Sequence, residues 1–499
     1  MVFAWILAIV ASILYFIKKL VDGNVNPKIF YKLLGRYRHI LPPILKFCFK
    51  DKSEDKLNRF KYVHKIFPRY LRMKFLNFDV ITVYDPELCK KIFNSQLACQ
   101  RPFRNCLQLE YGLLASTYHY WKTSRKHLNV AFNLNVLKGF IPIFDSYAVN
   151  VVNDMKSHLG GKEFDLLHPL AKLAGTTVAA TTLNAHGVEA SPSEVTKLID
   201  SINLSLDLLF KRIITPFWTF DSIYKFTKNY KIENEARKFT VDYGLELIAA
   251  ARKRKILEDK KIDENGNDCE KKPAKVNYII DQLVNHEEKF TDQEIQEHLM
   301  VILITASETT ANLVATTIIY LAIYQDIQQK VYEEIFQVFN DENIEVDYDN
   351  IGSLKYLEMV VKETLRLFSP IPISARETID EFDIGLDKPL AKGAKIVLLN
   401  YVLHQRTDLW GEDADKFDPE RFSPENMAKR DPYCFLPFGA GPRMCIGNRY
   451  AMLTVKIEIM RLIKAYRFST SIKEEEMKMK LSFTGKMSKK HMVTIEERK

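Results

Sequence analysis

The residues best suited to chemistry lie in one short loop, residues 438–447, which reads Phe-Gly-Ala-Gly-Pro-Arg-Met-Cys-Ile-Gly. Cys445 follows Arg443 by two residues and precedes Gly447 by two, and an apolar, helix-like run begins at residue 450. A helix N-terminus directs backbone N–H groups and the positive end of its dipole toward such a cysteine, which stabilises a thiolate. Glycines let the backbone approach a bulky planar partner, and Arg443 offers a cation for its carboxylates. The pattern predicts a thiolate that ligates haem iron.

Other interpretations of Cys445 are weaker. An isolated cysteine is most often an inert, buried apolar residue. A dinucleotide-binding fingerprint would require glycine at position 444, where the chain has Met444. A zinc site usually draws on paired cysteines, and the seven cysteines include no Cys-x-x-Cys pair. We therefore interpret Cys445 as the metal ligand.

The string Phe-x-x-Gly-x-Arg-x-Cys-x-Gly resembles the haem-binding signature of the cytochrome P450 monooxygenases. The resemblance implies haem b as cofactor, with Cys445 bound to its iron and with Phe438, Gly439 and Gly447 around it. The implied reaction inserts one oxygen atom of O2 into a lipophilic substrate.

Two further motifs follow the family's order. Lys-Glu-Thr-Leu-Arg at 362–366 resembles the family's Glu-x-x-Arg helix, and the segment at 417–422 resembles the one whose arginine completes a buried triad. The resemblance implies one ion network made by Glu363, Arg366 and Arg421. Taken alone, Glu363 and Arg366 would be only a surface pair one helical turn apart.

A set of cations is implied for the two haem propionates. Trp121 and Arg125 match the family's Trp-x-x-x-Arg helix, and a spacing of four places both on one helix face. Arg376 corresponds to another propionate contact of the family, and Arg443 lies in the cysteine loop. Two ionised propionates in an apolar pocket need several such partners.

The catalytic pair is expected on an apolar helix near residues 297–324. Glu308 and Thr309 match the family's acid–alcohol pair, which delivers protons to dioxygen. A threonine within a helix otherwise bonds back to the carbonyl four residues earlier. Ala306 stands where the family usually has glycine. In the family's fatty-acid ω-hydroxylase branch, the position of Thr305 often carries a glutamate that forms an ester bond with haem. Threonine cannot form this bond, so we expect haem to be held non-covalently apart from the Cys445–iron bond.

Composition agrees with one large catalytic unit. The chain has 499 residues, of which 47% are hydrophobic and 12% aromatic, enough for a sizeable core. Long periodic apolar stretches predict a mainly α-helical chain. Short strands are predicted near residues 79–84, 395–400 and 477–495. The resemblance implies the cytochrome P450 fold, an α-helical prism with small β-sheets, over residues 46–499.

The N-terminus predicts a membrane anchor. Residues 1–17 carry no charged side chain and are followed by Lys18 and Lys19. A helix of that length spans roughly 26 Å, close to the hydrocarbon thickness of the endoplasmic reticulum membrane. Basic residues after the apolar run keep the body cytosolic. We expect a signal anchor over residues 1–21 and a linker over 22–45, with the catalytic domain on the cytosolic face of the endoplasmic reticulum or microsome membrane.

The net charge of +9 does not indicate nucleic acid as a partner. Mixed charges between residues 252 and 275 are typical of a solvated loop between helices. The chain has no nicotinamide or flavin fingerprint, so electrons must come from another protein. The resemblance implies NADPH–cytochrome P450 reductase as donor, with cytochrome b5 as an optional second donor, and membrane lipid around the anchor.

The segment at 431–443 resembles the animal microsomal branch of fatty-acid ω-hydroxylases, whose insect members are associated with hormone and xenobiotic or insecticide metabolism. Two alternatives remain. A haem-thiolate isomerase or dehydratase would need no external electrons and little of the Glu308–Thr309 relay. A catalytically silent haem-binding carrier would keep Cys445 and dispense with the relay. The sequence leaves the substrate open.

Overall fold

The computed structural model describes residues 63–75, 78–102, 109–184, 192–215, 218, 221–264, 278–285, 289–340, 345–482 and 484–498. The predicted anchor at 1–21 and the predicted linker at 22–45 lie outside the described residues.

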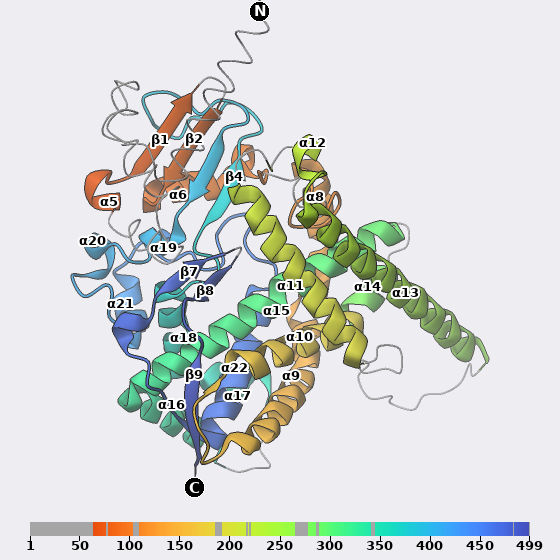
Figure 1. The fold of residues 1–499 in the computed structure, drawn as a ribbon, viewed down its shortest axis with the longest axis vertical. Helices are drawn as coiled ribbons and strands as arrows, with labels where there is room; N and C mark the ends of the chain where they lie inside the picture. Colours follow the sequence, from red (N-terminus) through yellow and green to blue (C-terminus); the bar gives the residue numbers. More distant parts are fainter. Residues whose placement is uncertain are drawn as a thin grey trace, which may run out of the picture.

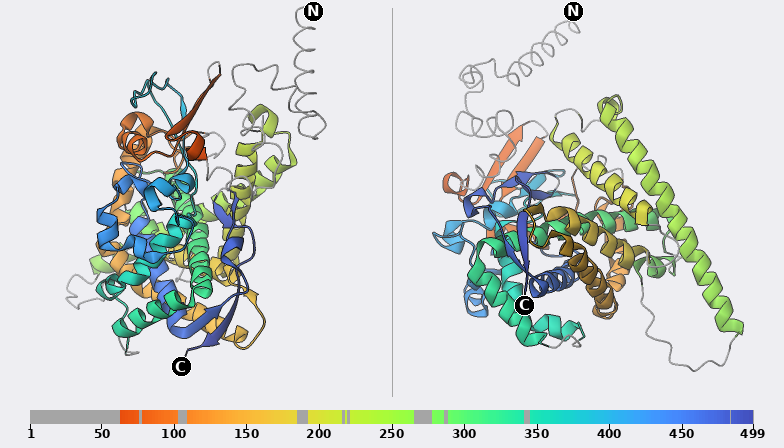
Figure 2. Two further views of the ribbon diagram at one scale, coloured as in Figure 1. Left: turned by 90° about the vertical axis from the view of Figure 1, so that its left-hand side faces the viewer. Right: turned by 60° about the horizontal axis from the view of Figure 1, so that its bottom comes forward.

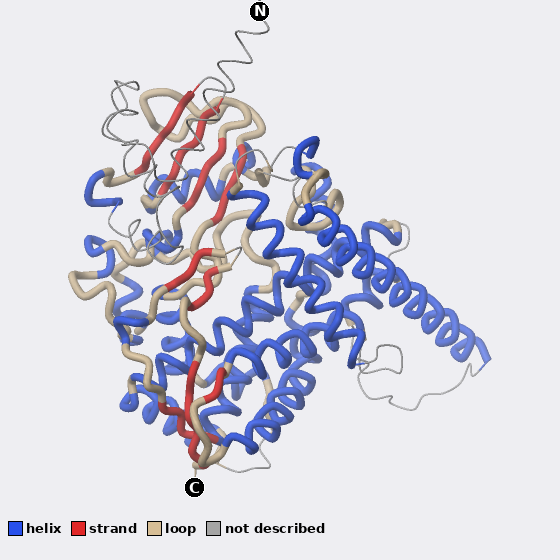
Figure 3. The backbone as a smooth tube through the Cα atoms, viewed as in Figure 1, coloured by secondary structure: helices blue, strands red, loops and turns tan. Residues whose placement is uncertain are grey.

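Helices dominate the described chain, and small sheets accompany them, as predicted (Figures 1 and 3). The amino-terminal half contains α5 (Val63–Ile66), α6 (Pro86–Asn94), α8 (Tyr118–Ala131), α9 (Leu134–Met155), α10 (Leu167–Leu183), α11 (Pro192–Ile214), α12 (Asp221–Tyr224) and α13 (Lys228–Glu264). The carboxyl-terminal half contains α14 (Ile279–Val284), α15 (Asp292–Ile323), α16 (Gln325–Val338), α17 (Tyr348–Ser353), α18 (Lys355–Leu367), α19 (Asn400–Leu403), α20 (Thr407–Trp410), α21 (Pro424–Ala428) and α22 (Asn448–Ala465).

Helix α15 runs through the centre of the body and contacts α10, α13, α18 and α22 (Figure 1). It begins with a capping box, because the Thr291 hydroxyl accepts from the Glu294 N–H while the Glu294 carboxylate accepts from the Thr291 N–H. Most of its apolar residues are buried, on all faces of the helix, which is typical of a core helix. Among the described helices, α15 alone has the length and hydropathy of a membrane span, and two thirds of that stretch is enclosed by protein.

Strands lie in each of the three predicted ranges. One sheet has the order β1 (Tyr70–Phe75), β2 (Phe78–Val83), β5 (Lys395–Leu398) and β4 (Ser374–Glu377), in which only the β2–β5 pairing is parallel. A second sheet orders β3 (Phe164–Asp165), β9 (Met492–Glu497) and β6 (Tyr466–Ser469). The strands β7 (Met479–Leu481) and β8 (Gly485–Met487) form an antiparallel hairpin. The structure adds β1, β3, β4 and β6, which the sequence does not predict. The first sheet lies at one end of the molecule, away from α16 and α22 (Figure 1).

The prediction of a loop between residues 252 and 275 is wrong for its first half. Helix α13 continues to Glu264 and projects from the body (Figure 2). Lysine, arginine, glutamate and leucine make up most of this stretch, and all four are good helix formers. Mixed charges are equally compatible with an exposed helix, so charge alone could not distinguish the two.

Glu458 of α22 carries a carboxyl group that is buried without a hydrogen-bond partner among the described residues. Its side chain is 1% exposed, and neither carboxyl oxygen has a hydrogen-bond partner in the described part of the chain. Burial raises the pKa of Glu458 to about 8. The folded protein therefore holds this group protonated, whereas the unfolded chain ionises it near its ordinary value.

We predict that Glu458 makes the protein less stable as pH rises. Because the pKa of Glu458 is higher in the folded than in the unfolded state, its contribution to the free energy of unfolding is fully present below the unfolded-state pKa. As pH rises toward the folded-state pKa, this contribution is lost by up to about 1.4 kcal/mol per pH unit. In thermal unfolding between about pH 5 and about pH 8, Glu458→Gln should therefore gain stability relative to the wild type as pH rises. The exposed Glu246→Gln serves as control. Parallel pH profiles of the wild type and Glu458→Gln would contradict this prediction.

Candidate functional site

Cys445 lies directly before a helix, as its sequence context predicted. Gly447 is the N-cap of α22, and the Cys445 N–H donates to the Phe438 carbonyl at 3.0 Å. This bond closes the loop so that both ends of the motif lie together. The sulfur is accessible although the residue lies deep in the protein, so it faces an internal space.

Two glycines of the loop are required by its backbone. Gly439 and Gly441 adopt φ values of +69° and +66°, which side chains disfavour. A Cβ atom at residue 441 would lie 2.0 Å from the Phe93 carbonyl oxygen. The cysteine loop therefore packs directly on the carboxyl end of α6.

The environment of the Cys445 thiol has opposing effects. Burial raises its pKa, while the Gly447 N–H and the guanidinium groups of Arg125 and Arg101 lower it. The expected helix-terminus stabilisation is present but is outweighed by burial. A cation bound at sulfur would remove the thiol proton outright.

Arg443 and Trp121 are brought together. The Arg443 guanidinium lies 4.1 Å from the centre of the Trp121 ring and is 7% exposed. It donates to the Cys99 carbonyl at 2.9 Å and to the Leu113 carbonyl at 3.1 Å. These contacts fix the side chain beside the cysteine loop. Arg125 follows Trp121 by four residues on α8. It lies close enough to the sulfur for its positive charge to lower the pKa of the Cys445 thiol.

Arg101 is a site residue that sequence reasoning missed. The Glu377 N–H donates to the Gln100 carbonyl at 2.8 Å, which aligns this segment with β4. Arg101 then donates to the Ala375 carbonyl at 3.1 Å and lies beside Arg376. No local motif marks Arg101, because its place depends on pairing with a strand far along the chain.

Four arginines at this site share one electrostatic property. Burial is the largest cause that lowers the pKa of each, to about 10 for Arg101 and about 9 for Arg443. Mutual repulsion lowers the values of Arg376 and Arg443 further. In the described residues no carboxylate forms an ion pair with any of the four, and the buried Arg101 Nε has no hydrogen-bond partner. The set is therefore suited to a bound anion.

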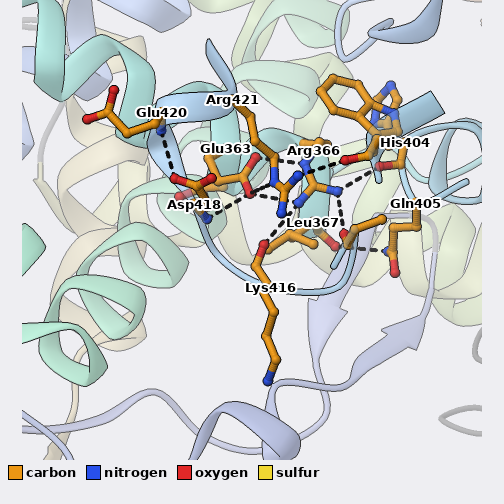
Figure 4. A network of polar contacts seen from close by, with 12 residues as sticks. Glu363, Arg366, Leu367, His404, Gln405, Lys416, Asp418, Glu420 and Arg421 are labelled. Atoms are coloured by element: carbon orange, nitrogen blue, oxygen red, sulfur yellow. Dashed lines mark hydrogen bonds and ion pairs between the residues drawn. The ribbon is translucent and has the colours of Figure 1, made fainter. Parts of the chain in front are cut away.

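Glu363 and Arg366 form a fully buried pair on α18 (Figure 4). Two hydrogen bonds of 2.7 Å join the guanidinium to the carboxylate. The Asp418 N–H donates to Glu363 at 3.0 Å, and Arg366 also donates to the His404 and Ala414 carbonyls. The pair thereby holds several loop segments against α18.

Arg421 joins this network by a weaker contact than expected. Its Nε lies 3.6 Å from Glu363 Oε1 without a hydrogen bond, while its Nη2 lies 2.7 Å from Asp413. His404 is a second missed residue: its Nε2 accepts from the Leu436 N–H at 2.9 Å, just before the cysteine loop. Burial lowers the pKa of His404 to about 3, so the ring stays neutral. His404 thus links the ion network to the loop.

The middle of α15 holds the predicted acid and alcohol. The Thr309 hydroxyl donates to the Thr305 carbonyl at 2.6 Å, and Thr305 in turn donates to Val301 at 2.7 Å. Glu308 instead meets Lys486 and Thr484 of the carboxyl-terminal hairpin. No hydrogen bond joins the Glu308 carboxylate to Thr309, both of which are described. The two side chains are adjacent in sequence but held by different partners.

An uncovered stretch interrupts the burial of α15. The residues concerned are Ile304, Thr305, Ala306, Glu308 and Thr309. A cavity of about 190 Å³ adjoins this stretch and lies between α11, α13 and α15. Its lining includes Leu109, Ile202, Arg237, Thr240, Met300 and Ile304. An organic molecule in this space would lie alongside α15.

Comparison with known proteins agrees with the sequence motifs. The cytochrome P450 family model matches residues 40–495. The chain is 28% identical over 419 residues to cytochrome P450 4g1 of Drosophila melanogaster, covering 78% of this chain and 74% of that protein. It is 27% identical over 404 residues to cytochrome P450 4V2 of Mus musculus, covering 80% and 76%. It is 28% identical over 429 residues to probable cytochrome P450 313a2 of Drosophila melanogaster, covering 84% of each.

Members of this family bind haem b through a cysteine thiolate, receive electrons from a redox partner and oxidise lipophilic substrates. The match over most of the chain confirms the resemblance drawn from the motifs. The chain belongs to the cytochrome P450 family and is a cytochrome P450 monooxygenase.

Proposed function

We propose that Cys445 would hold haem b through a thiolate–iron bond and that the protein inserts one oxygen atom of O2 into a lipophilic substrate. The observation that carries the proposal is the accessible sulfur before α22. Near it lie the buried Arg376 and Arg443 and the half-buried Arg101 and Arg125, none of which forms an ion pair with a carboxylate in the described residues. A lone buried cysteine would need no such surroundings.

The donor set fits haem b. Its two propionates are the anions that Arg101, Arg125, Arg376 and Arg443 lack, and the Trp121 indole adds a neutral donor. Charge-assisted hydrogen bonds to carboxylates are strong in a site with little water.

Haem b bound through a cysteinate activates dioxygen for insertion into a C–H bond. Thr309 commits its own hydroxyl proton to the Thr305 carbonyl, so its oxygen lone pairs can accept a hydrogen bond from water or from an acid. Glu308 is the adjacent acid that can refill this path from solvent. Ala306 stands where the family usually has glycine, and the α15 backbone is helical throughout. The proposed relay therefore depends on the side chains of Glu308 and Thr309.

The cavity along α15 is the candidate substrate space. Five apolar residues, among them Met300 and Ile304, give it apolar wall area for a lipophilic molecule. We propose an insect-type hormone, a fatty acid or a xenobiotic, including insecticides, as the substrate class. The other seven lining residues are polar, including Glu233, Arg237 and Glu297, which favours a substrate that also carries polar groups.

We propose the endoplasmic reticulum or microsome membrane as the location, with the catalytic domain in the cytosol and an anchor over residues 1–21. The exposed apolar side chains of Ile223, Phe226 and Ile232 support this proposal, since 44%, 90% and 43% of their surfaces are accessible. Lysines 225, 228 and 231 surround them, which suits an anionic membrane interface. NADPH–cytochrome P450 reductase would supply the electrons, with cytochrome b5 as an optional second donor.

The relay role of Thr309 is tested by removing its hydroxyl. Loss of a proton-relay group should slow the proton-dependent step by about 10²–10⁴-fold. Thr309→Val should therefore keep its haem but divert most NADPH oxidation to hydrogen peroxide, measured with added reductase. Thr310→Val is the matched control, because its neighbouring hydroxyl is buried at 3% exposure and faces the core.

An unchanged ratio of peroxide to NADPH in Thr309→Val would contradict the relay. The isomerase or dehydratase alternative would then gain if the protein consumed an organic peroxide without NADPH. The carrier alternative would gain if neither cosubstrate were consumed.

The arginine set predicts how tightly haem is held. A charge-assisted hydrogen bond contributes about 1.5–3 kcal/mol, which corresponds to about 10- to 100-fold in affinity. Arg101→Met should therefore lose haem about 10-fold faster or more to an excess of haem-free myoglobin, as followed by Soret absorbance. The exposed Arg449→Met on α22 should lose haem at the wild-type rate. If Arg101→Met and Arg449→Met lost haem at the same rate, Arg101 would not contribute to haem binding.

A further inference from the structure

Lys486 connects three elements that meet at the acid of the proposed relay. Its ammonium lies 2.5 Å from Glu308 Oε1 on α15 and 3.8 Å from Asp207 Oδ1 on α11. The second oxygen of Glu308 accepts from the Thr484 hydroxyl at 3.0 Å. Glu308 is 10% exposed, Lys486 31% and Asp207 54%. One cation is therefore shared between a nearly buried carboxylate and an exposed one.

The backbone that carries Lys486 is held firmly. The Gly485 N–H donates to the Pro370 carbonyl at 2.8 Å. A Cβ at Gly485 would lie 2.7 Å from both the Met479 sulfur and the Ser369 carbonyl oxygen, so the hairpin packs tightly there. Met487 points into the core, and alternation along the strand turns Lys486 the other way. Motion in this ion chain must therefore come from the lysine side chain or from α11.

Both oxygens of Glu308 are engaged on the hairpin side, and neither bonds to Thr309. To pass a proton to the Thr309 hydroxyl, the carboxyl group must leave Lys486. Asp207 offers the ammonium a second partner when this happens. Ile202 and Ser205, on the same helix as Asp207, line the cavity along α15, so a molecule bound there contacts α11 directly.

We infer that Lys486 is a positioning residue for Glu308 and that Asp207 competes for it. When α11 lies close to the hairpin, Asp207 draws the ammonium away and frees Glu308 to serve Thr309. The proton comes from solvent, and Glu308 returns to its carboxylate form after passing it on. This inference rests on the proposed relay function of Glu308 and Thr309.

The experiment measures hydrogen peroxide released per NADPH oxidised by full-length haem-loaded protein with reductase and no added substrate. Asp207→Asn removes the competing charge, so Lys486 stays on Glu308 and the peroxide fraction should rise about 2- to 3-fold, within the range measured for exposed ion pairs. In a Lys486→Met background the same Asp207→Asn change should have no effect. Lys486→Arg should restore the Asp207 dependence.

Lys480→Met is the matched control. Lys480 faces Lys486 in the hairpin register, is exposed, and forms no ion pair in the part of the chain that the structure describes. It should leave the peroxide fraction and its Asp207 dependence unchanged. Haem content and the reduced carbonyl spectrum of every variant establish that each has folded.

Two results would overturn the inference. An Asp207→Asn change that is silent, or one that acts equally with and without Lys486, would show that the two residues are not coupled. Thr309→Val distinguishes this from failure of the relay itself. If Thr309→Val raises peroxide while the Asp207 and Lys486 variants do not, only the inference fails; if Thr309→Val is also silent, the proposed relay fails.

Discussion

The rest of the site depends on four guanidinium groups, two buried (Arg376 and Arg443) and two half-buried (Arg101 and Arg125), that have no carboxylate partner in the part of the chain that the structure describes. Transfer of an unpaired charge from water into protein is costly, and burial accordingly lowers the pKa of all four. The arginines come from β4, α8, the segment after α6 and the cysteine loop. The Cys445 thiolate offsets part of the charge of Arg101 and Arg125, and an anionic ligand placed among these elements would offset the rest. Folding of this region and binding of a dianionic cofactor are therefore linked, because a ligand that binds only the folded state stabilises it.

The cysteine loop is held on both sides. Gly441 packs against the Phe93 carbonyl on one side, where no side chain could fit. On the other, His404 connects the Glu363–Arg366 pair to the backbone before the loop. A neutral imidazole accepts the Leu436 N–H, and burial keeps it neutral. The position of the sulfur is thus set by these contacts of the loop backbone, together with the hydrogen bond from the Gly447 N–H.

The sequence predicted those parts of the site that depend on local spacing. Glu363 and Arg366 lie one turn apart on one helix, Trp121 and Arg125 share a helix face, and Cys445 precedes a helix. Each relation holds within a few residues and is fixed by the helix repeat.

Contacts between distant segments were not predictable in this way. Arg101 reaches the site through pairing with β4, and His404 and Lys486 act across more than 30 and 170 residues respectively. Nothing in their local sequence distinguishes them from other arginines, histidines or lysines. Helix α13 was missed in part for a different reason, since charged residues suit both a loop and an exposed helix.

The most direct test of the central claim is the absorption spectrum of the reduced carbonyl complex in two cysteine variants. Cys434 is a suitable comparison, because it lies in the same region, is 3% exposed, and has a pKa raised by burial to about 11. We predict that the wild type and Cys434→Ser show the long-wavelength Soret band of thiolate-ligated haem, and that Cys445→Ser loses it. A thiolate band that persists in Cys445→Ser, or that disappears in Cys434→Ser, would show that Cys445 is not the iron ligand.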